Sequence, residues 1–499
     1  MRLNPLWFRG LRSYLWLIFI PTEPSLQKLS RYVQGKTMFF KQFYLESLGH
    51  ASYFIGSEET GEALVLDVRR DVDTYFDTAG QQGMQIRYAA DTHQHNDYLT
   101  GICELPQRGN VQLIGSARAD LDYKVRGMGD GDRLEMGEIV FEAMQTPGHT
   151  PEHISFLVTD RGRGEEPVML LSGGALLVDD VGRPDLLGSE EDIRRHAGQL
   201  CHTLQEKILK LPDYVEVYPT HVAGSLCGGS IGSRLSTTIG YERRMNQMLA
   251  NLATQDEFVK QCMDLSELPT VPPYWPRMRK ANRQGPPLLG VLADPPPLTV
   301  NQFEQLQQDG ALVVDCRSPE AFASHIPGAI NVPLSASFAT WAGSVLPPNV
   351  PLILMLERSS DLWEACWQLL RIGYDLPRGW LAGGIKSWRI AAREIEFLPL
   401  WSVHSLRDQM QRQDDLFVLD VRQQAEWNSG HIKEATFITG AELPERLDEV
   451  PRNRPVGVIC GSGYRASVAA SLLQHHGWRD VANVLGGMTA WQQADYETV

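Results

Sequence analysis

Apolar and polar residues alternate in short segments along the first half of the chain, with the two-residue period of β-strands. Segments of this kind between turn residues predict strands at 39–45, 51–55, 63–68, 83–90, 111–115, 133–134, 138–145, 154–159 and 168–172. Apolar positions at helical spacing predict helices over 72–82 and 191–211, and a further helix that starts within 101–108. Strands interleaved with helices in this order predict an α/β fold.

The pattern changes near residue 284, where the chain becomes rich in proline, as in QGPP (284–287) and DPPP (294–297). Such stretches are typical of linkers. Beyond them the sequence repeats itself, because VVDCR at 313–317 is echoed by VLDVR at 418–422. The offset of 105 residues is too long for a solenoid unit, so the repeat predicts two small α/β domains of one kind.

A chain of 499 residues is too long for one hydrophobic core and predicts about three domains. The expected division is a poorly structured N-terminal extension, a first domain, a proline-rich linker, a middle domain and a C-terminal domain, at 1–37, 38–283, 284–297, 298–396 and 397–499. Residues 1–37 superficially resemble a signal peptide, with arginines before the apolar run 15–20. That run is too short to span a bilayer and no small-residue cleavage site follows, although a membrane anchor is the alternative.

Composition and charge restrict the possible partners. A net charge of −15 argues against nucleic acid, because phosphate binding needs clustered lysine and arginine, whereas small anionic substrates remain compatible. The seven cysteines are odd in number, scattered and without a C-x-x-C pair. This usage favours a reducing cytoplasm over a disulfide framework. We therefore expect a cytoplasmic protein that binds neither nucleic acid nor a membrane.

The first candidate site is the segment DTHQHNDYLTG at 91–101, which follows a predicted strand. His93, His95 and Asp97 place three potential metal ligands within five residues. Two further histidines lie in other turns, His149 in TPGHTP and His221 in YPTH. Imidazole and carboxylate are ligands of zinc and of non-haem iron. One such segment alone could be an ordinary polar loop, but histidines at three separate strand ends favour a metal site.

The second candidate site is Cys460, which lies between a predicted buried strand at 456–459 and a predicted helix at 466–476. Backbone N–H groups of such a turn, together with the helix dipole, favour a thiolate or a persulfide anion. Arg465 adds positive charge to this loop. The alternative is that Cys460 is a buried structural cysteine without a chemical role. The expected loop also contains Gly461, Ser462, Gly463 and Tyr464.

Taken in order, the motifs T-H-x-H-x-D, T-P-G-H-T and G-R-P-D-L, then a histidine before A-G-S-L-C-G, resemble the metallo-β-lactamase fold. More narrowly, they resemble persulfide dioxygenases fused to rhodanese domains, from about Met38 to the C-terminus. The resemblance implies an αβ/βα sandwich followed by two rhodanese-like α/β domains. The six-residue loop from Cys460 to Arg465 resembles that of rhodanese sulfurtransferases.

The resemblance also implies one Fe(II) ion, held by two histidines and a carboxylate. His93 and His149 match the histidines, but Gly174 stands where the aspartate is expected, and Tyr98 replaces a histidine of a second metal. Water or an anion could fill the missing position, His95 could complete a three-histidine, zinc-like site, or the site could be empty. Asp97 with His221 could support a ligand or hold a second metal.

Two more positions take roles from the resemblance. Cys227, in AGSLCG, matches a cysteine beside the metal and could receive or relay sulfane sulfur; the alternative is a small buried apolar residue. In the middle domain, Leu356 and Glu357 stand where the C-terminal domain has its cysteine loop, and neither can act as its nucleophile. The middle domain is therefore expected to lack the catalytic cysteine and to serve packing or orientation.

The resulting expectation is an enzyme of sulfide detoxification, both oxidoreductase and transferase. It would oxidise a low-molecular-weight thiol persulfide, of glutathione or coenzyme A type, with O₂, and exchange sulfane sulfur through Cys460 without a cofactor there. Thiosulfate and sulfite would be its further partners, and a homo-oligomer is expected. The alternatives are a metal-free scaffold with rhodanese activity alone, and a zinc-dependent thioester hydrolase.

Overall fold

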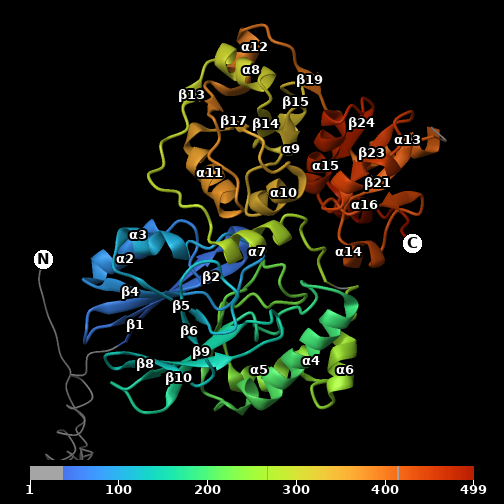
Figure 1. Cartoon of the computed structure of the whole chain (residues 1–499). Helices are drawn as coiled ribbons and strands as arrows, with labels where there is room; N and C mark the ends of the chain where they lie inside the picture. The colour runs from blue at the N-terminus through green and yellow to red at the C-terminus, as the bar shows by residue number, and fades with distance from the viewer. Residues whose placement is uncertain (1–37, 267, 413–414) are drawn as a thin grey trace, which may run out of the picture.

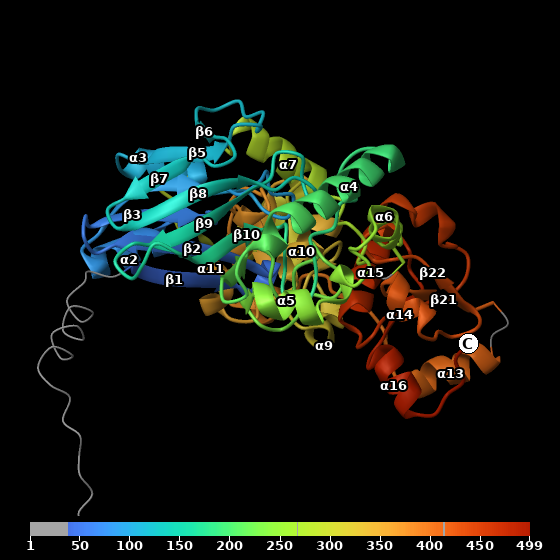
Figure 2. The ribbon, with the colours of Figure 1, turned by 90° about the horizontal axis from the view of Figure 1, so that it is seen from below.

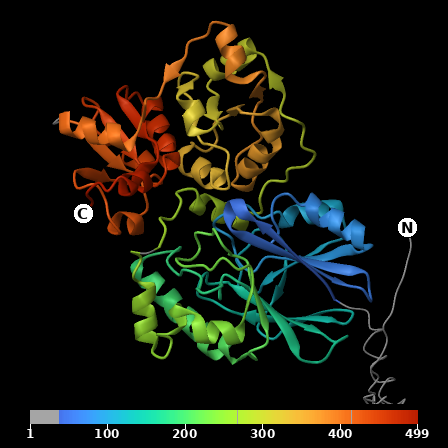
Figure 3. The same cartoon turned by 180° about the vertical axis from the view of Figure 1, so that it is seen from behind.

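The structure is a computed structural model that describes residues 38–266, 268–412 and 415–499 (Figure 1). The predicted N-terminal extension lies outside these residues. The described chain forms a two-sheet sandwich, then a middle domain and a C-terminal domain, each built on its own sheet. Figure 3 shows the same arrangement from behind, with the middle and C-terminal domains side by side against the sandwich. None of the described helices is long and apolar enough to cross a membrane.

The sandwich packs two six-stranded sheets face to face. The first sheet has the order β1 Met38–Leu45, β2 His50–Ser57, β3 Glu62–Leu66, β4 Gln85–Ala90, β5 Gln112–Ser116 and β6 Arg126–Met128. The second has the order β12 Thr237–Thr238, β11 Glu216–Pro219, β10 Pro167–Gly173, β9 Ile154–Asp160, β8 Ile139–Gln145 and β7 Arg133–Met136. Large apolar side chains from the two inner faces, such as Tyr53 and Phe141, share one buried cluster. This burial stabilises the predicted sandwich.

Helices cover the outer faces of both sheets, which completes the predicted four layers (Figure 2). The helices are α2 Asp73–Gln82 and α3 Leu105–Arg108 on the first sheet, and α4 Glu190–Glu206, α5 Ile239–Met245 and α6 Gln255–Cys262 on the second. The helix predicted over 191–211 ends early, because Lys207 leaves the helical conformation. Residues 208–210 then form a separate 3-10 turn. Pro212 explains why this turn goes no further, since a proline disfavours helical backbone at the residue before it and Leu211 is extended.

The middle and C-terminal domains repeat one topology. The middle sheet has the order β13 Pro297–Leu298, β18 Trp380–Leu381, β17 Leu352–Met355, β14 Leu312–Asp315 and β16 Ile330–Asn331. The C-terminal sheet has the order β20 Leu400–Trp401, β24 Val481–Val484, β23 Val456–Ile459, β21 Phe417–Asp420 and β22 Ala435–Phe437. Both are fully parallel and place corresponding strands in the same positions. The repeat predicted from the sequence is thus a repeated fold.

The remaining elements connect or cover these sheets. In the middle domain they are α8 Val300–Gln308, α9 Pro319–Phe322, α10 Phe338–Val345, α11 Leu362–Arg371, α12 Gly384–Ile390 and the two-stranded sheet of β15 Ser324–His325 with β19 Glu396–Phe397. In the C-terminal domain they are α13 Val403–Arg412, α14 Gln424–Asn428, α15 Tyr464–His475 and α16 Gly487–Gln493. Short 3-10 helices occur at Glu46–Leu48, Ile102–Glu104, Ile208–Lys210, Gln247–Leu249, Ser359–Asp361, Leu443–Glu445 and Leu447–Glu449.

Helix α7, Trp275–Gln284, lies between the sandwich and the other two domains (Figure 1). Its Asn282 side chain donates to the carbonyls of His95 and Tyr98, both at 2.8 Å, and accepts from the Thr100 N–H. The Tyr274 hydroxyl just before the helix donates to the Asp97 carbonyl at 3.1 Å. These bonds fix the backbone of the histidine segment in one conformation.

Helix α15 is buried between its own sheet and the middle domain. The run Ala466–Leu473 is buried on every side, which agrees with its composition of alanine, serine and aliphatic residues. The Ser467 hydroxyl donates to Asn331 Oδ1 at 2.6 Å, and the Asn331 N–H donates to Ser471 Oγ at 2.9 Å. The middle domain therefore supports the helix that follows Cys460.

Replacing Asn331 by alanine should destabilise this interface. The Asn331 amide also donates to the carbonyls of Asp315 and Arg317, at 2.9 and 3.0 Å, so its loss leaves buried polar groups without partners. We expect the free energy of unfolding to fall by about 1–3 kcal/mol, measured by denaturant titration. The exposed Asn110→Ala is the control and should change it by less than about 0.5 kcal/mol. Equal effects of the two substitutions would contradict the assignment.

Candidate functional site

The candidate site lies at the edge where the two sheets of the sandwich join. His50 at the start of β2 forms an antiparallel bridge with His221, which follows β11. The Ala51 N–H donates to the Thr220 carbonyl at 2.7 Å, which reinforces the junction. The histidine segment after β4 ends at the same edge. Three chain segments distant in sequence thus meet there, as expected for an α/β site built on strand ends.

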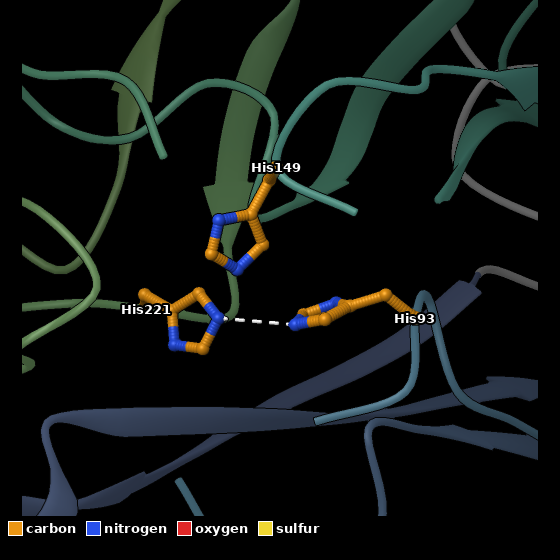
Figure 4. Close-up of side chains that lie close together, drawn as sticks. All are labelled: His93, His149 and His221. Atoms are coloured by element: carbon orange, nitrogen blue, oxygen red, sulfur yellow. Dashed lines mark hydrogen bonds between the residues drawn. The ribbon is translucent and has the colours of Figure 1, made fainter. Parts of the chain in front are cut away.

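Three imidazoles converge at this edge: His93 after β4, His149 after β8 and His221 after β11 (Figure 4). One ligand atom of each lies within 4.8 Å of those of the other two. The Nε2 atoms of His93 and His221 are 3.2 Å apart. All three side chains are buried, with His93 the most exposed at 5%. The distances are those of ligands arranged around one small cation.

Hydrogen bonds fix the orientation of two of these rings. His149 Nδ1 lies 2.9 Å from the Arg183 carbonyl and can only donate to it, which leaves Nε2 as an acceptor. That Nε2 is buried and has no hydrogen-bond partner among the described residues. His93 Nδ1 lies 2.9 Å from Thr92 Oγ1. Metal-ligating histidines typically use their second nitrogen in this way.

Burial also keeps the imidazoles neutral. It lowers the pKa of His149 to about 4, and it lowers the pKa values of His93 and His221 well below 6.5, with neighbouring histidines adding to the effect. A neutral imidazole with a free nitrogen is the form that binds a metal. The unpartnered His149 nitrogen and the three-imidazole donor set therefore fit a divalent transition metal such as iron or zinc.

His95 does not belong to this cluster. Its Nε2 lies 3.2 Å from Asp67 Oδ1 in a fully buried pair. Burial lowers the pKa of His95, but the hydrogen bond and charge of Asp67 outweigh this, so the pKa is raised overall. The His95 ring lies beside His93, with centroids 4.2 Å apart, but it is His221 whose ligand atom lies within 4.8 Å of those of both His93 and His149.

Gly174 occupies the position where the family pattern has an aspartate. Its N–H donates to His153 Nε2 at 2.8 Å. A Cβ atom added at Gly174 would overlap the His149 ring, which therefore fills the space that a side chain here would need. The His149 ring thus occupies the space in which the resemblance led us to expect a carboxylate.

Asp97 and Cys227 lie beside the cluster on the His221 side. A ligand atom of each lies within 4.8 Å of one on His221, and the Asp97 Oδ2 to His221 Nδ1 distance is 3.6 Å. Burial raises the pKa of Asp97 to about 6, and neither carboxylate oxygen has a hydrogen-bond partner in the described part of the chain. Burial also raises the pKa of the Cys227 thiol well above 9, which keeps it protonated as the structure stands.

Arg183 and Asp185 form an ion pair that supports the position of His149. Arg183 Nε and a terminal nitrogen donate to the two oxygens of Asp185, each at 2.7 Å. Its other terminal nitrogen donates to the Pro269 carbonyl at 2.7 Å, before α7. Because the Arg183 carbonyl also holds His149, this pair connects the cluster to the segment that leads into α7.

Sequence reasoning missed two buried histidines at this edge, His50 and His153. His153 stacks against His93 with ring centroids 5.2 Å apart, and His50 lies 4.3 Å from the Tyr98 ring. Both His50 nitrogens and the Tyr98 hydroxyl lack partners within residues 38–266, 268–412 and 415–499. His153 is four residues beyond His149, a spacing that could have revealed it; no local signal marks His50. So many unpaired buried polar atoms indicate a functional site.

The loop of Cys460 forms the second site. β23 ends at Ile459, α15 begins at Tyr464, and the Gly463 N–H donates to Cys460 Sγ at 3.1 Å. Gly463 has a φ of +106°, and a Cβ there would be 3.2 Å from the Leu485 backbone, so glycine is required. The sulfur lies against its loop amide as expected, but the residue is fully buried.

The other loop residues hold Cys460 in place. Two guanidinium nitrogens of Arg465 donate to Glu426 at 2.5 and 2.7 Å, so its charge is shared with a carboxylate that sequence reasoning missed. The Tyr464 hydroxyl donates to the Pro333 carbonyl of the middle domain at 2.7 Å. Gly461 packs against Arg465, and Ser462 is exposed and accepts from the Gly486 N–H through its carbonyl.

The middle domain has no such loop. Leu356 is buried and Glu357 is exposed at the corresponding position after β17. Cys316 is buried with Sγ 3.8 Å from the Val314 carbonyl, and Cys366 is buried within α11. Cys316 follows β14 and Cys366 lies inside α11, so neither cysteine is in the turn after β17 that corresponds to the Cys460 loop.

Comparison with known proteins agrees with this architecture. The model of the rhodanese-like domain matches residues 299–391 and 402–494. The mitochondrial persulfide dioxygenase ETHE1 of Mus musculus is 28% identical over 241 residues, which are 47% of this chain and 84% of the relative. Its Homo sapiens counterpart is 29% identical over 215 residues, 42% of this chain and 74% of the relative.

A solved structure covers more of the chain. The crystal structure of a metallo-β-lactamase from Staphylococcus aureus subsp. aureus COL is 34% identical, with a TM-score of 0.63. The match covers 69% of this chain and 98% of that chain. The chain therefore belongs to the metallo-β-lactamase-fold family, and it carries two rhodanese-like domains after the sandwich.

Proposed function

We propose that this protein is a persulfide dioxygenase and sulfurtransferase. The sandwich oxidises a low-molecular-weight thiol persulfide with O₂, and Cys460 exchanges sulfane sulfur with an acceptor. The observation that carries this is the convergence of His93, His149 and His221, on the same chain as a cysteine whose sulfur accepts a loop N–H. The persulfide dioxygenases among the relatives support the substrate class. The domain limits belong to this proposal: 38–283, 298–396 and 397–499.

The proposed metal ligands are the three converging histidines, with Fe(II) as the metal and zinc as the alternative. When bound, ferrous iron supplies open coordination positions for O₂ and for a persulfide sulfur. The Arg183 carbonyl orients His149, and Thr92 orients His93. Asp97 lies beside His221, with Oδ2 3.6 Å from Nδ1, so that a negative charge on it favours a proton on that nitrogen. In the same proposal, Cys227 accepts or relays sulfane sulfur beside this cluster.

Cys460 carries the transfer step. Its thiolate attacks the outer sulfur of the donor R–S–S⁻, the Sγ–S bond forms, and the donor's S–S bond breaks to release R–S⁻. Sulfite then attacks the outer sulfur of the Cys460 persulfide, giving thiosulfate and regenerating the thiolate. The Gly463 N–H and the N-terminus of α15 stabilise the anionic sulfur in both forms. Each half-reaction transfers one sulfane sulfur atom and needs no external oxidant or reductant.

A second candidate function is sulfur transfer alone, with the sandwich as a scaffold. Gly174 favours it, because the family's carboxylate ligand is missing and its space is filled by His149. The two candidates differ in whether the sandwich binds metal and consumes O₂. A zinc-dependent thioester hydrolase is a third outcome, and it would appear as thioester turnover by the zinc-loaded protein.

Iron loading should separate these functions. After anaerobic addition of Fe(II) and removal of excess metal, we expect bound iron by elemental analysis and O₂ uptake on addition of glutathione persulfide or coenzyme A persulfide. Iron-free protein should consume no O₂. A chain that retains no iron, yet transfers sulfur from thiosulfate to cyanide, would support the scaffold function instead.

The third ligand can be tested by a matched pair of substitutions. His221→Gln should lower iron affinity by at least about tenfold, since removal of even a supporting group costs 10–100-fold. His95→Gln keeps a donor for Asp67 and should retain the iron. Equilibrium dialysis of both variants, with circular dichroism to check folding, measures the difference. The reverse order of affinities would identify His95 as the ligand.

Sulfur transfer from thiosulfate to cyanide should depend on Cys460 and not on the buried cysteines of the middle domain. Cys460→Ser should abolish thiosulfate-to-cyanide transfer, because a hydroxyl is a far weaker nucleophile than a thiolate. Cys316→Ser, at a buried position of the middle domain, should keep the activity. Persistent transfer in Cys460→Ser would show that another thiol carries the sulfur.

A further inference from the structure

A cavity of about 630 Å³ lies where the sandwich, the middle domain and the C-terminal domain meet. Its volume falls within the range of sites that bind small organic molecules. Each of the three domains contributes part of the wall: Ser47 and Leu226, Ala336 and Trp341, and Tyr464 and Arg465. Neither the imidazole cluster nor Cys460 lines the cavity, but residues of the Cys227 turn and of the Cys460 loop do.

The sandwich side of the cavity is the turn that carries Cys227. Ala223, Gly224 and Leu226 line the cavity, and Cys227 follows directly. A ligand atom of Cys227 lies within 4.8 Å of one on His221. This turn therefore contributes to the cavity wall and, through Cys227, to the surroundings of His221.

The opposite side is the loop of Cys460. Tyr464 and Arg465 line the cavity, and the Arg465 guanidinium lies over Gly461, where an added Cβ would be 3.0 Å from its terminal nitrogen. Cys460 belongs to the same loop, is fully buried and does not itself line the cavity. The cavity wall thus includes residues of both the Cys227 turn and the Cys460 loop.

The middle domain closes the cavity. Ala336 and Ser337 are exposed at its wall, and Trp341 of α10 supplies an apolar surface. The Ser335 hydroxyl donates to the Tyr464 hydroxyl at 3.0 Å, which connects this wall to the loop of the C-terminal domain. A domain without a nucleophile therefore contributes to the surroundings of both reactive sites.

The cavity wall also offers groups for a polar ligand. Ser47 is 9% exposed, and its hydroxyl has no hydrogen-bond partner in the residues that the structure describes. Arg465 provides a cation whose partner Glu426 is part-exposed and could be displaced by another carboxylate. An unpaired buried hydroxyl, a cation and an indole suit a small molecule with polar groups and a flexible apolar stem.

We propose that this cavity binds the organic part of a low-molecular-weight thiol persulfide and presents its outer sulfur to Cys460. The inference rests on the proposed function and names the place where its substrate docks. Cys460 Sγ bonds to the outer sulfur, the carrier's S–S bond breaks, and the carrier thiolate stays in the cavity until it takes up a proton and leaves. Because the Cys227 turn forms the opposite wall, one docking site serves both reactive centres.

Filling the cavity tests this. Ala336→Trp adds an indole at an exposed lining position, and Ala391→Trp, at an exposed alanine of the same domain away from the cavity, is the matched control. Persulfidation of Cys460 is followed by mass spectrometry with glutathione persulfide, coenzyme A persulfide or thiosulfate as donor. We expect Ala336→Trp to raise the KM for one persulfide relative to the KM for thiosulfate by roughly tenfold. Ala391→Trp should leave this ratio unchanged.

The persulfide that shows the effect identifies the carrier. Ser47→Ala tests the cavity without turnover. We expect this substitution to weaken binding of the corresponding thiol, measured by calorimetry. An equal rise in KM for thiosulfate and both persulfides, or no rise at all, overturns the docking site while the proposed function stands. A wild-type chain that neither consumes O₂ nor transfers sulfur overturns the proposed function itself.

Discussion

The buried carboxylate of Asp67 holds the histidine edge together. It accepts hydrogen bonds from the Thr92 N–H at 2.7 Å and from the Thr92 and Thr220 hydroxyls, and it pairs with His95. Each threonine is followed directly by a histidine of the cluster. One side chain at the end of β3 therefore sets the positions of imidazoles that come from β4 and β11. Because Asp67 is fully buried, this hydrogen-bond network is stable only when its donors and acceptors are paired.

The sequence predicted the architecture well because its signals are local. The two-residue period identified most strands, and the 105-residue repeat identified two like domains. It also placed Cys460 at a strand-to-helix turn, where β23 and α15 put it. The third imidazole could not be predicted in this way, because the choice between His95 and His221 depends on how separate strand ends meet. The pairings of Asp67 and of Glu426 are likewise tertiary, and nothing in the local pattern signals them.

The middle domain lacks a nucleophile, but its contacts position the two sites on either side of it. Its Arg371 carbonyl accepts from the Leu99 N–H at 2.7 Å, and the Arg371 side chain pairs with Asp71 of the sandwich at 2.9 Å. On its other side, Asn331 supports the helix after Cys460. The domain thus fixes the histidine segment and the cysteine loop relative to each other.

Gly174 has a consequence for how this site could change over time. Because the His149 ring occupies the space beyond Gly174, a new carboxylate there would collide with a residue that the site already uses. A side chain at position 174 would therefore require a further change that lets the His149 ring move. Substitutions at these two positions are coupled by packing, so their effects on stability should not be additive.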